Sequence, residues 1–211
     1  MPAAPRSPAA VQQLALLDWR RAVFALYADV RADPDPAAAW VGWRRRRDVL
    51  FAEHPQTPLD PAGVAAFRGL DYFPYDPALR VLAEVAPEPP VARTLAVSTG
   101  ETVAAHRFAV ARFQLADEPC ALPLYWLDGY GGGLFLPFAD ATNGASTYAA
   151  GRYLLDTIKG ADLGGDGDGL VLDFNFAYNP SCAYRVDWTC PLPAPESRLG
   201  VAVRAGERTS A

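Results

Sequence analysis

Two stretches decide the fold of this chain: residues 134–155, LFLPFADATNGASTYAAGRYLL, and residues 170–191, LVLDFNFAYNPSCAYRVDWTCP. Each carries a short apolar run typical of a strand, with polar side chains set between aromatic residues. An acidic, glycine-rich segment, KGADLGGDGDG, joins them. We therefore expect residues 152–158 and 170–176 to form a hairpin with a mobile tip.

The polar side chains of these stretches are the candidate binding residues. Asp140 leaves an apolar run, and a partly buried carboxylate needs a cation or several donors, for which Arg152 is the nearest candidate. Asp173 and Asn175 should share one face of the predicted strand 170–176. We expect these groups to converge on a small polar or anionic molecule, with Asp140 or Asp173 as general acid or base if the protein is an enzyme. The predicted ligand-binding set is Asp140, Thr142, Thr147, Tyr148, Arg152, Tyr153, Asp173, Asn175, Tyr178, Asn179 and Tyr184.

Two other interpretations stay open. The same groups can form a fully satisfied internal network that fixes the fold of a non-catalytic structural or interaction module. Cys182 and Cys190, with Cys120, can form a zinc or redox site, although no close Cys-x-x-Cys pair supports zinc and two buried thiols are expected. The sequence shows no P-loop, Rossmann fingerprint or nucleophile–histidine–acid set, so we predict no cofactor and leave catalysis undecided.

Helices are predicted before the strands. Apolar residues recur at helical spacing up to about residue 30, after a cap at Ser7, and two further helices cover about 37–52 and 59–68. Four arginines, residues 44–47, point all round the second helix, which favours a solvated or salt-bridged role. We expect residues 1–69 to be a helical segment packed on a β-rich body, residues 70–211, in one globular unit.

From residue 70 the apolar period changes to two, which indicates strands. The pattern predicts strands at 79–85, 91–98, 102–115, 121–127, 134–138 and 198–204 besides the hairpin. A phase slip within 102–115 indicates a β-bulge, the glycine-rich residues 128–133 a hairpin turn, and the residues beyond Gly206 a polar tail. The predicted class is mainly β (α+β): an antiparallel barrel or sandwich preceded by two to three helices.

Composition limits the partners. The 211 residues are 51% hydrophobic and 20% charged, with a net charge of −5, as in soluble globular proteins. The negative charge argues against nucleic acid and anionic membranes, and no apolar run is long enough for a membrane span. The first ten residues lack the apolar core of a signal peptide, so we expect a cytoplasmic protein. A small-molecule ligand is the expected partner, and the oligomeric state stays open.

Several longer motifs resemble a bacterial and archaeal family, domain of unknown function 1684. They are FADATNG with TYAAGRYL, then DFNFAYNPSCAY, CPLP, RL and AGE, preceded by RD and by TPL leading to FRGL. The resemblance spans about residues 47–207. The family pattern usually carries a second proline and an asparagine where Ala194 and Ser197 stand. The resemblance implies which motif residues matter and implies no activity.

Overall fold

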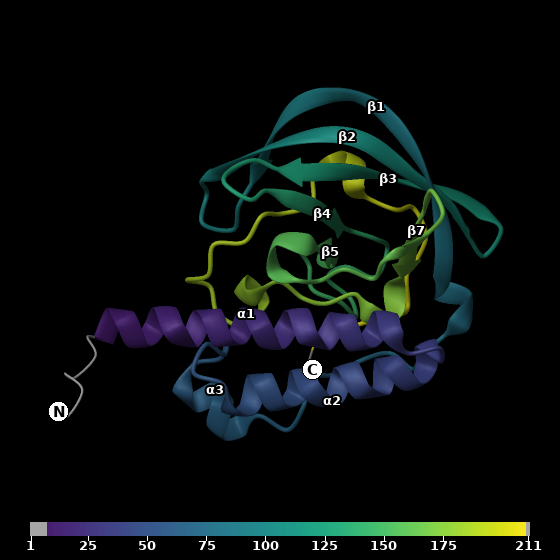
Figure 1. The fold of residues 1–211 in the computed structure, drawn as a ribbon. Helices are drawn as coiled ribbons and strands as arrows, with labels where there is room; N and C mark the ends of the chain where they lie inside the picture. The colour runs from purple at the N-terminus through teal and green to yellow at the C-terminus, as the bar shows by residue number, and fades with distance from the viewer. Residues whose placement is uncertain (1–7, 210–211) are drawn as a thin grey trace.

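Three helices precede the sheet: α1 Pro8–Ala32, α2 Pro36–Glu53 and α3 Pro61–Ala66. The computed structural model describes residues 8–209, so the cap predicted at Ser7 lies outside the described residues (Figure 1). The Asp35 carboxylate caps α2 by accepting from the N–H of Ala37 at 2.9 Å, and Pro36 takes the first helical position, where no N–H is needed. Within residues 8–209 no helix has the length and apolarity to cross a membrane, and the cytoplasmic location stays a prediction.

The body is a seven-stranded antiparallel sheet in the order β5-β4-β3-β2-β1-β7-β6. Three helices followed by this sheet confirm the predicted α+β class, and the sheet is sandwich-like, not closed into a barrel. The β2–β3 pairing has one register shift, between Arg107 and Ala109, and is continuous from Val110 to Phe113, where the apolar pattern predicted a bulge. The strands are β1 Arg80–Ala96, β2 Thr102–Leu115, β3 Glu118–Leu127, β4 Gly133–Phe138, β5 Arg152–Asp156, β6 Gly165–Asp166 and β7 Gly169–Asp173.

The predicted hairpin of 152–158 with 170–176 is wrong. β5 pairs with β4, whereas β7 pairs with β1, so the two segments lie at opposite sides of the sheet. β7 also ends at Asp173, because the Asp173 carboxylate accepts from the N–H of Asn175 and starts a 3₁₀ turn, η3 Phe174–Phe176. Asp173 and Asn175 therefore do not share one face of a strand, as the sequence had predicted.

Two other strand predictions also differ from the structure. Residues 87–90 do not separate two strands, because β1 absorbs the prolines as a register shift between Pro87 and Val91. Residues 198–204 form no strand and keep one bridge, between Ala139 and Arg198. This segment runs beside the sheet, where the buried Arg152 side chain donates hydrogen bonds to the carbonyls of Val203 and Ala205.

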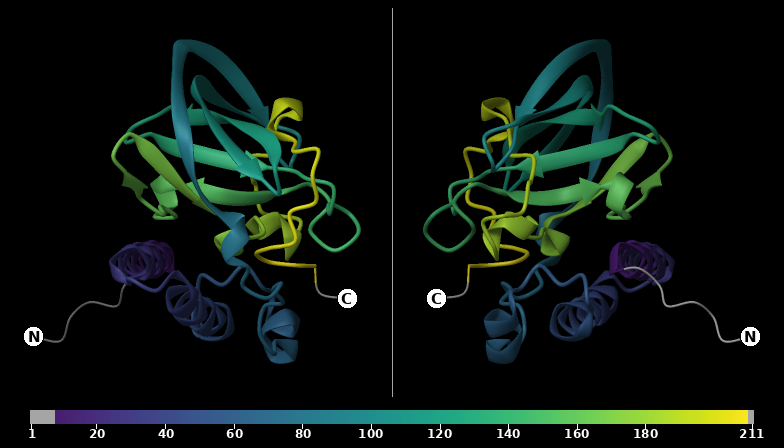
Figure 2. Two further views of the ribbon diagram at one scale, coloured as in Figure 1. Left: turned by 90° about the vertical axis from the view of Figure 1, so that its right-hand side faces the viewer. Right: turned by 90° about the vertical axis from the view of Figure 1, so that its left-hand side faces the viewer.

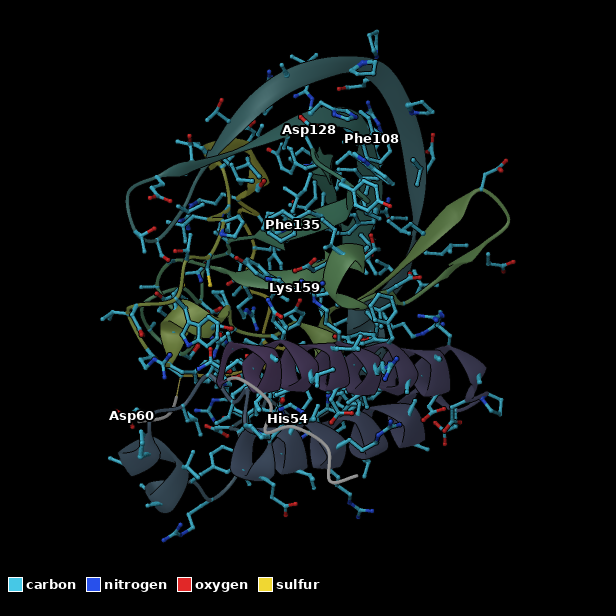
Figure 3. The ribbon with its side chains drawn as sticks, turned by 60° about the vertical axis from the view of Figure 1, so that its left-hand side comes forward. His54, Asp60, Phe108, Asp128, Phe135 and Lys159 are labelled. Carbon is cyan, nitrogen blue, oxygen red and sulfur yellow. The ribbon has the colours of Figure 1, made fainter. Side chains whose placement is uncertain are left out.

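The curved sheet stands over the helices, which lie together on one side of it (Figure 2). One apolar core joins them: Trp43 of α2 packs edge-on against Phe176 at 5.1 Å between ring centroids, and Phe113 packs against Phe174 at 5.6 Å. Side chains fill the space between helices and sheet in Figure 3. The curvature also brings β5 to the chain that follows β7, through a bridge between Tyr153 and Tyr178.

The chain beyond Gly206 is not simply a polar tail. Glu207 is 1% exposed and forms a bridge with Tyr72, and its carboxylate pairs with Arg47 at 3.0 Å. Arg47 is correspondingly buried and salt-bridged, so one of the four arginines of α2 joins the core. The C-terminal segment is thus fixed between the helices and the sheet.

Candidate functional site

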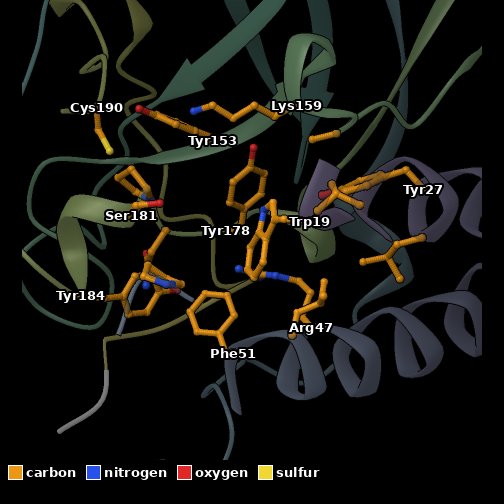
Figure 4. Close-up of a pocket in the computed structure, with 17 residues that line it drawn as sticks. Trp19, Tyr27, Arg47, Phe51, Tyr153, Lys159, Tyr178, Ser181, Tyr184 and Cys190 are labelled. Atoms are coloured by element: carbon orange, nitrogen blue, oxygen red, sulfur yellow. The ribbon is translucent and has the colours of Figure 1, made fainter. Parts of the chain in front are cut away.

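A cavity of about 110 Å³ lies where α1 and α2 meet the segment that follows β7 (Figure 4). α1 supplies Trp19 and Tyr27, and α2 supplies Arg47 and Phe51. The sheet side supplies residues from β5, from the 3₁₀ turn η2 Thr157–Lys159 and from the 3₁₀ turn η4 Ser181–Ala183. The complete lining is Trp19, Val23, Leu26, Tyr27, Arg47, Leu50, Phe51, Pro58, Tyr153, Lys159, Ala161, Tyr178, Asn179, Pro180, Ser181, Tyr184 and Cys190.

Six of the seventeen residues that line the cavity are aromatic. Phe51 and Tyr184 pack edge-on with centroids 5.0 Å apart, and Tyr153 and Tyr178 pack in the same way at 5.8 Å. Edge-to-face pairs fix the orientation of each ring, so the wall is preformed. Such a wall suits a flat or apolar ligand body.

Arg47 is held at the base of the cavity by three kinds of contact. Its Nη1 donates to Tyr72 at 2.7 Å and to Glu207 at 3.0 Å, and its guanidinium lies 5.3 Å from the Tyr178 ring centroid. Burial alone would lower the pKa of Arg47, but the oxygens of Tyr72 and Glu207 raise it well above its ordinary value. Arg47 is therefore a fixed cation.

The lining contains two cations, Arg47 and Lys159, and no carboxylate among the described residues. Lys159 is the only lysine in the sequence, and its Nζ lies 3.5 Å from Asp156 Oδ2. Glu207, which balances Arg47, is not part of the lining and accepts from the Tyr184 hydroxyl and from the Asn179 N–H at 3.1 Å. The cations of the lining are thus accompanied by aromatic, aliphatic and neutral polar side chains.

Tyr178 and Asn179 place further polar groups in the lining. Figure 4 shows the Tyr178 hydroxyl inside the cavity, on the side from which Lys159 enters. Burial raises the pKa of Tyr178 well above its ordinary value, so this hydroxyl is a neutral donor. The Asn179 amide nitrogen donates to Glu207 at 3.2 Å, while its Oδ1 is buried and unpaired. Buried polar atoms are normally satisfied, so the unpaired Asn179 Oδ1 can accept a hydrogen bond from a ligand.

Asp140 and Arg152 meet each other, but away from this cavity. Arg152 Nη2 donates to Asp140 Oδ2 at 2.7 Å, with both side chains fully buried, and also to the Val203 carbonyl at 2.9 Å. Thr142 donates its N–H to Asp140 Oδ1 at 2.5 Å, and its hydroxyl lies 2.8 Å from that of Thr147. This cluster ties the segment after residue 198 to β4 and β5, as the internal-network interpretation expects.

Asp173 and Asn175 form another separate cluster. Asn175 Nδ2 donates to Asp173 Oδ1 at 2.8 Å and to the Asp76 carbonyl at 2.8 Å, while Asn175 Oδ1 accepts from the Asp76 N–H at 2.9 Å. These bonds join the loop before β1 to the end of β7. Burial raises the pKa of Asp173, against the hydrogen bonds from Asn175. Asp173 borders a different hollow of about 230 Å³, beside Arg31 and Arg80.

The predicted ligand-binding residues thus lie in several separate places in the structure. Tyr153, Tyr178, Asn179 and Tyr184 line the main cavity, whereas Tyr148 donates to the sulfur of Cys182 at 3.8 Å. The sequence interpretation missed the helical half of the lining, with Trp19, Tyr27, Arg47 and Phe51, and it also missed Lys159 of η2. The motifs that resemble the family did contain Arg47 and its partner. They include Arg47-Asp48 and Ala205-Gly206-Glu207, and the side chains of Arg47 and Glu207 form a salt bridge in the structure.

Cys182 and Cys190 lie together at one end of the cavity, and all three cysteines are free. Across residues 8–209 no group of three or more His, Cys, Asp or Glu side chains is arranged to hold a metal ion.

Comparisons with known proteins agree with the motifs. The model of a family described as protein of unknown function (DUF1684) matches residues 65–208. A solution NMR structure of an uncharacterized protein from Haloarcula marismortui is similar, with 39% identity, a TM-score of 0.58, and coverage of 79% of this chain and 90% of that one. No curated protein matches the chain.

Proposed function

We infer the function of this chain, which belongs to the DUF1684 family of proteins of unknown function, from its main cavity. We propose that the cavity binds a small aromatic or apolar acid. The ring of the ligand lies against the aromatic wall, and its carboxylate lies toward Lys159 and Tyr178. This proposal replaces Asp140 and Arg152 as binding groups by residues of the helices and of η2.

One observation carries the proposal: the lining pairs cations with aromatic rings and has no acidic residue in the described part of the chain. A carboxylate entering the cavity meets donors, whereas a cationic ligand would meet Arg47 and Lys159, whose carboxylate partners Glu207 and Asp156 lie outside the lining. Charge-assisted hydrogen bonds are the strong ones, and aromatic walls add contact area without flexible side chains.

The size of the cavity limits the ligand. Pockets for drug-sized ligands measure roughly 300–1,000 Å³, whereas a cavity of about 150 Å³ holds benzene. At about 110 Å³ the cavity is smaller than this reference, so it admits at most a single ring or a short chain. Benzoate is therefore a fitting probe, and benzyl alcohol is its uncharged counterpart.

Thermal-shift titration with benzoate tests the proposal. A ligand that binds only the folded state raises the melting temperature with concentration. We expect Lys159→Met to weaken benzoate binding about tenfold, equivalent to ~1.4 kcal/mol, because one charge-assisted contact is lost. Binding of benzyl alcohol should not change.

The matched control is Arg112→Met, which removes an exposed cation from β2, far from the lining residues in sequence. It should leave the response to benzoate as in the parent protein. Equal weakening by both variants would show a general charge effect and would contradict a carboxylate site at Lys159.

A second candidate is a non-catalytic interaction module, favoured by the exposed apolar side of α1. Val11 is 52% exposed and Phe24 is 49% exposed, and Leu14 and Leu17 lie exposed between them. The buried clusters of Asp140 and Asp173 would then only brace the fold. Under this alternative neither benzoate nor benzyl alcohol stabilises the protein.

A further inference from the structure

Two cysteines, eight positions apart in the sequence, meet at the end of the main cavity. The N–H of Cys182 donates to the sulfur of Cys190 at 3.3 Å, and the two residues are 6% and 4% exposed. Only Cys190 belongs to the cavity lining, where Figure 4 shows its sulfur at the same end as the Tyr153 hydroxyl. The pair is thus shielded from bulk solvent but borders a space that a small molecule can enter.

The backbone on both sides holds the cysteines in place. The Cys190 N–H donates to the Ser98 hydroxyl at 3.1 Å, and its carbonyl accepts from the Ser98 N–H at 2.9 Å. Cys182 lies in η4, where the N–H of Ala183 donates to the Pro180 carbonyl at 2.9 Å. Because each residue is fixed to a different part of the fold, the approach of the sulfurs does not depend on the exposed loop between them.

The surroundings favour one thiolate in the pair. The hydrogen bond from the Cys190 thiol lowers the pKa of Cys182 to about 6, against the effect of burial, and the Tyr148 hydroxyl adds a second donor. Sharing its proton with Cys182 raises the pKa of Cys190. Tyr148 itself stays protonated near neutral pH, because burial raises its pKa to about 12. A thiolate beside a thiol is the arrangement that thiol–disulfide exchange uses.

We propose that Cys182 and Cys190 form a redox site that exchanges with low-molecular-weight disulfides and closes to an intrachain disulfide. A small disulfide enters beside Cys190, and the Cys182 thiolate attacks one of its sulfurs. A mixed disulfide forms at Cys182, and a small thiolate leaves. Cys190 then gives its proton to the second departing sulfur and attacks the Cys182 sulfur. The products are one protein disulfide, one small thiol and one small thiolate, so the small disulfide is reduced as the dithiol is oxidised.

This inference does not depend on the proposed ligand. It uses the cavity only as the path to Cys190, and a protein that binds no acid can still exchange disulfides. The zinc interpretation of the same cysteines gains no third ligand from the described residues.

The test equilibrates the full chain in buffers of increasing ratio of hydroxyethyl disulfide to 2-mercaptoethanol, a short-chain pair that suits the cavity, followed by alkylation of free thiols and peptide mapping by mass spectrometry. We expect a disulfide between Cys182 and Cys190, reversed by dithiothreitol, with Cys120 alkylated throughout. Cys120→Ser should give the same disulfide at the same ratio of disulfide to thiol, which shows that the third thiol takes no part.

Two results would overturn the inference. One is alkylation of both Cys182 and Cys190 even in the most oxidising buffer. The other is oxidation that ends in separate 2-mercaptoethanol adducts or in linked chains, without the intrachain disulfide. The parent protein carries the decisive measurement, so failure of a variant to fold does not affect the test.

Discussion

The Asp140 carboxylate accepts hydrogen bonds from Arg152 and Thr142. Sequence reasoning predicted the pairing of Asp140 with Arg152, since a carboxylate leaving an apolar run needs a cation. It could not tell a buried brace from a binding group, because both require the same residue types. The two roles differ in what else Arg152 binds. Here Arg152 also donates to the Val203 carbonyl, which comes from a distant part of the chain.

Asp140→Asn should destabilise the protein by about 3–5 kcal/mol, because it leaves the buried Arg152 cation without its counter-charge. Urea unfolding followed by tryptophan fluorescence measures the change. Asp128→Asn is the control, since Asp128 pairs with His106 at 2.9 Å on the surface, where a pair contributes only ~0–1 kcal/mol. Similar losses in both variants would contradict the bracing role of Asp140.

Arg47 and Glu207 show a further limit at the residue scale. Nothing in a run of four arginines identifies the one that is buried, because the run covers all sides of the helix. The partner, Glu207, lies 160 positions away in the chain, so only the folded structure brings the two together.

Individual helices and strands were easier to predict from the sequence than the pairing between strands. The three helices and the strand 102–115 follow from local periodicity and proline or glycine signals, which depend on nearby residues alone. The partners of β5 and β7 do not follow from local periodicity, because β5 pairs with β4, and β7 pairs with β1 across a long separation in the sequence. The same distant pairing creates the cavity, by bringing Tyr153 against Tyr178.

Glycines at two positions should respond to alanine in opposite directions. Gly42 lies within α2 with open space around its Cβ position, so Gly42→Ala should stabilise the protein by about 0.5–1 kcal/mol. Gly151 precedes β5 with a φ of +100°, and a Cβ there would lie 2.6 Å from Pro193. Gly151→Ala should therefore destabilise it by at least ~1–3 kcal/mol.

Melting temperatures of the two glycine variants, measured side by side, check this pair of predictions. A stable Gly151→Ala protein would show that the turn before β5 does not need the left-handed conformation. A less stable Gly42→Ala protein would show that the exposed face of α2 carries contacts beyond those described.

At the scale of the whole molecule, helices from the first quarter of the chain cover one side of a cavity whose other side comes from the last third (Figure 1). The motifs that resemble the family lie mainly in the second half of the chain, so they include residues of mainly one wall of the cavity. The C-terminal segment then joins the two halves, through Arg152 and through the pair of Arg47 with Glu207. The cavity is therefore a property of the complete fold and not of any one motif.

The most direct test of the central claim uses the single lysine of the chain. Protein labelled with ¹³C-lysine gives one Lys159 side-chain signal set, which can be followed by NMR while benzoate is added. If the cavity binds small acids, the Lys159 Cε signal should shift progressively and saturate with benzoate, while benzyl alcohol produces a smaller shift at the same concentration. A Lys159 signal that stays unchanged at high benzoate concentration would contradict the account.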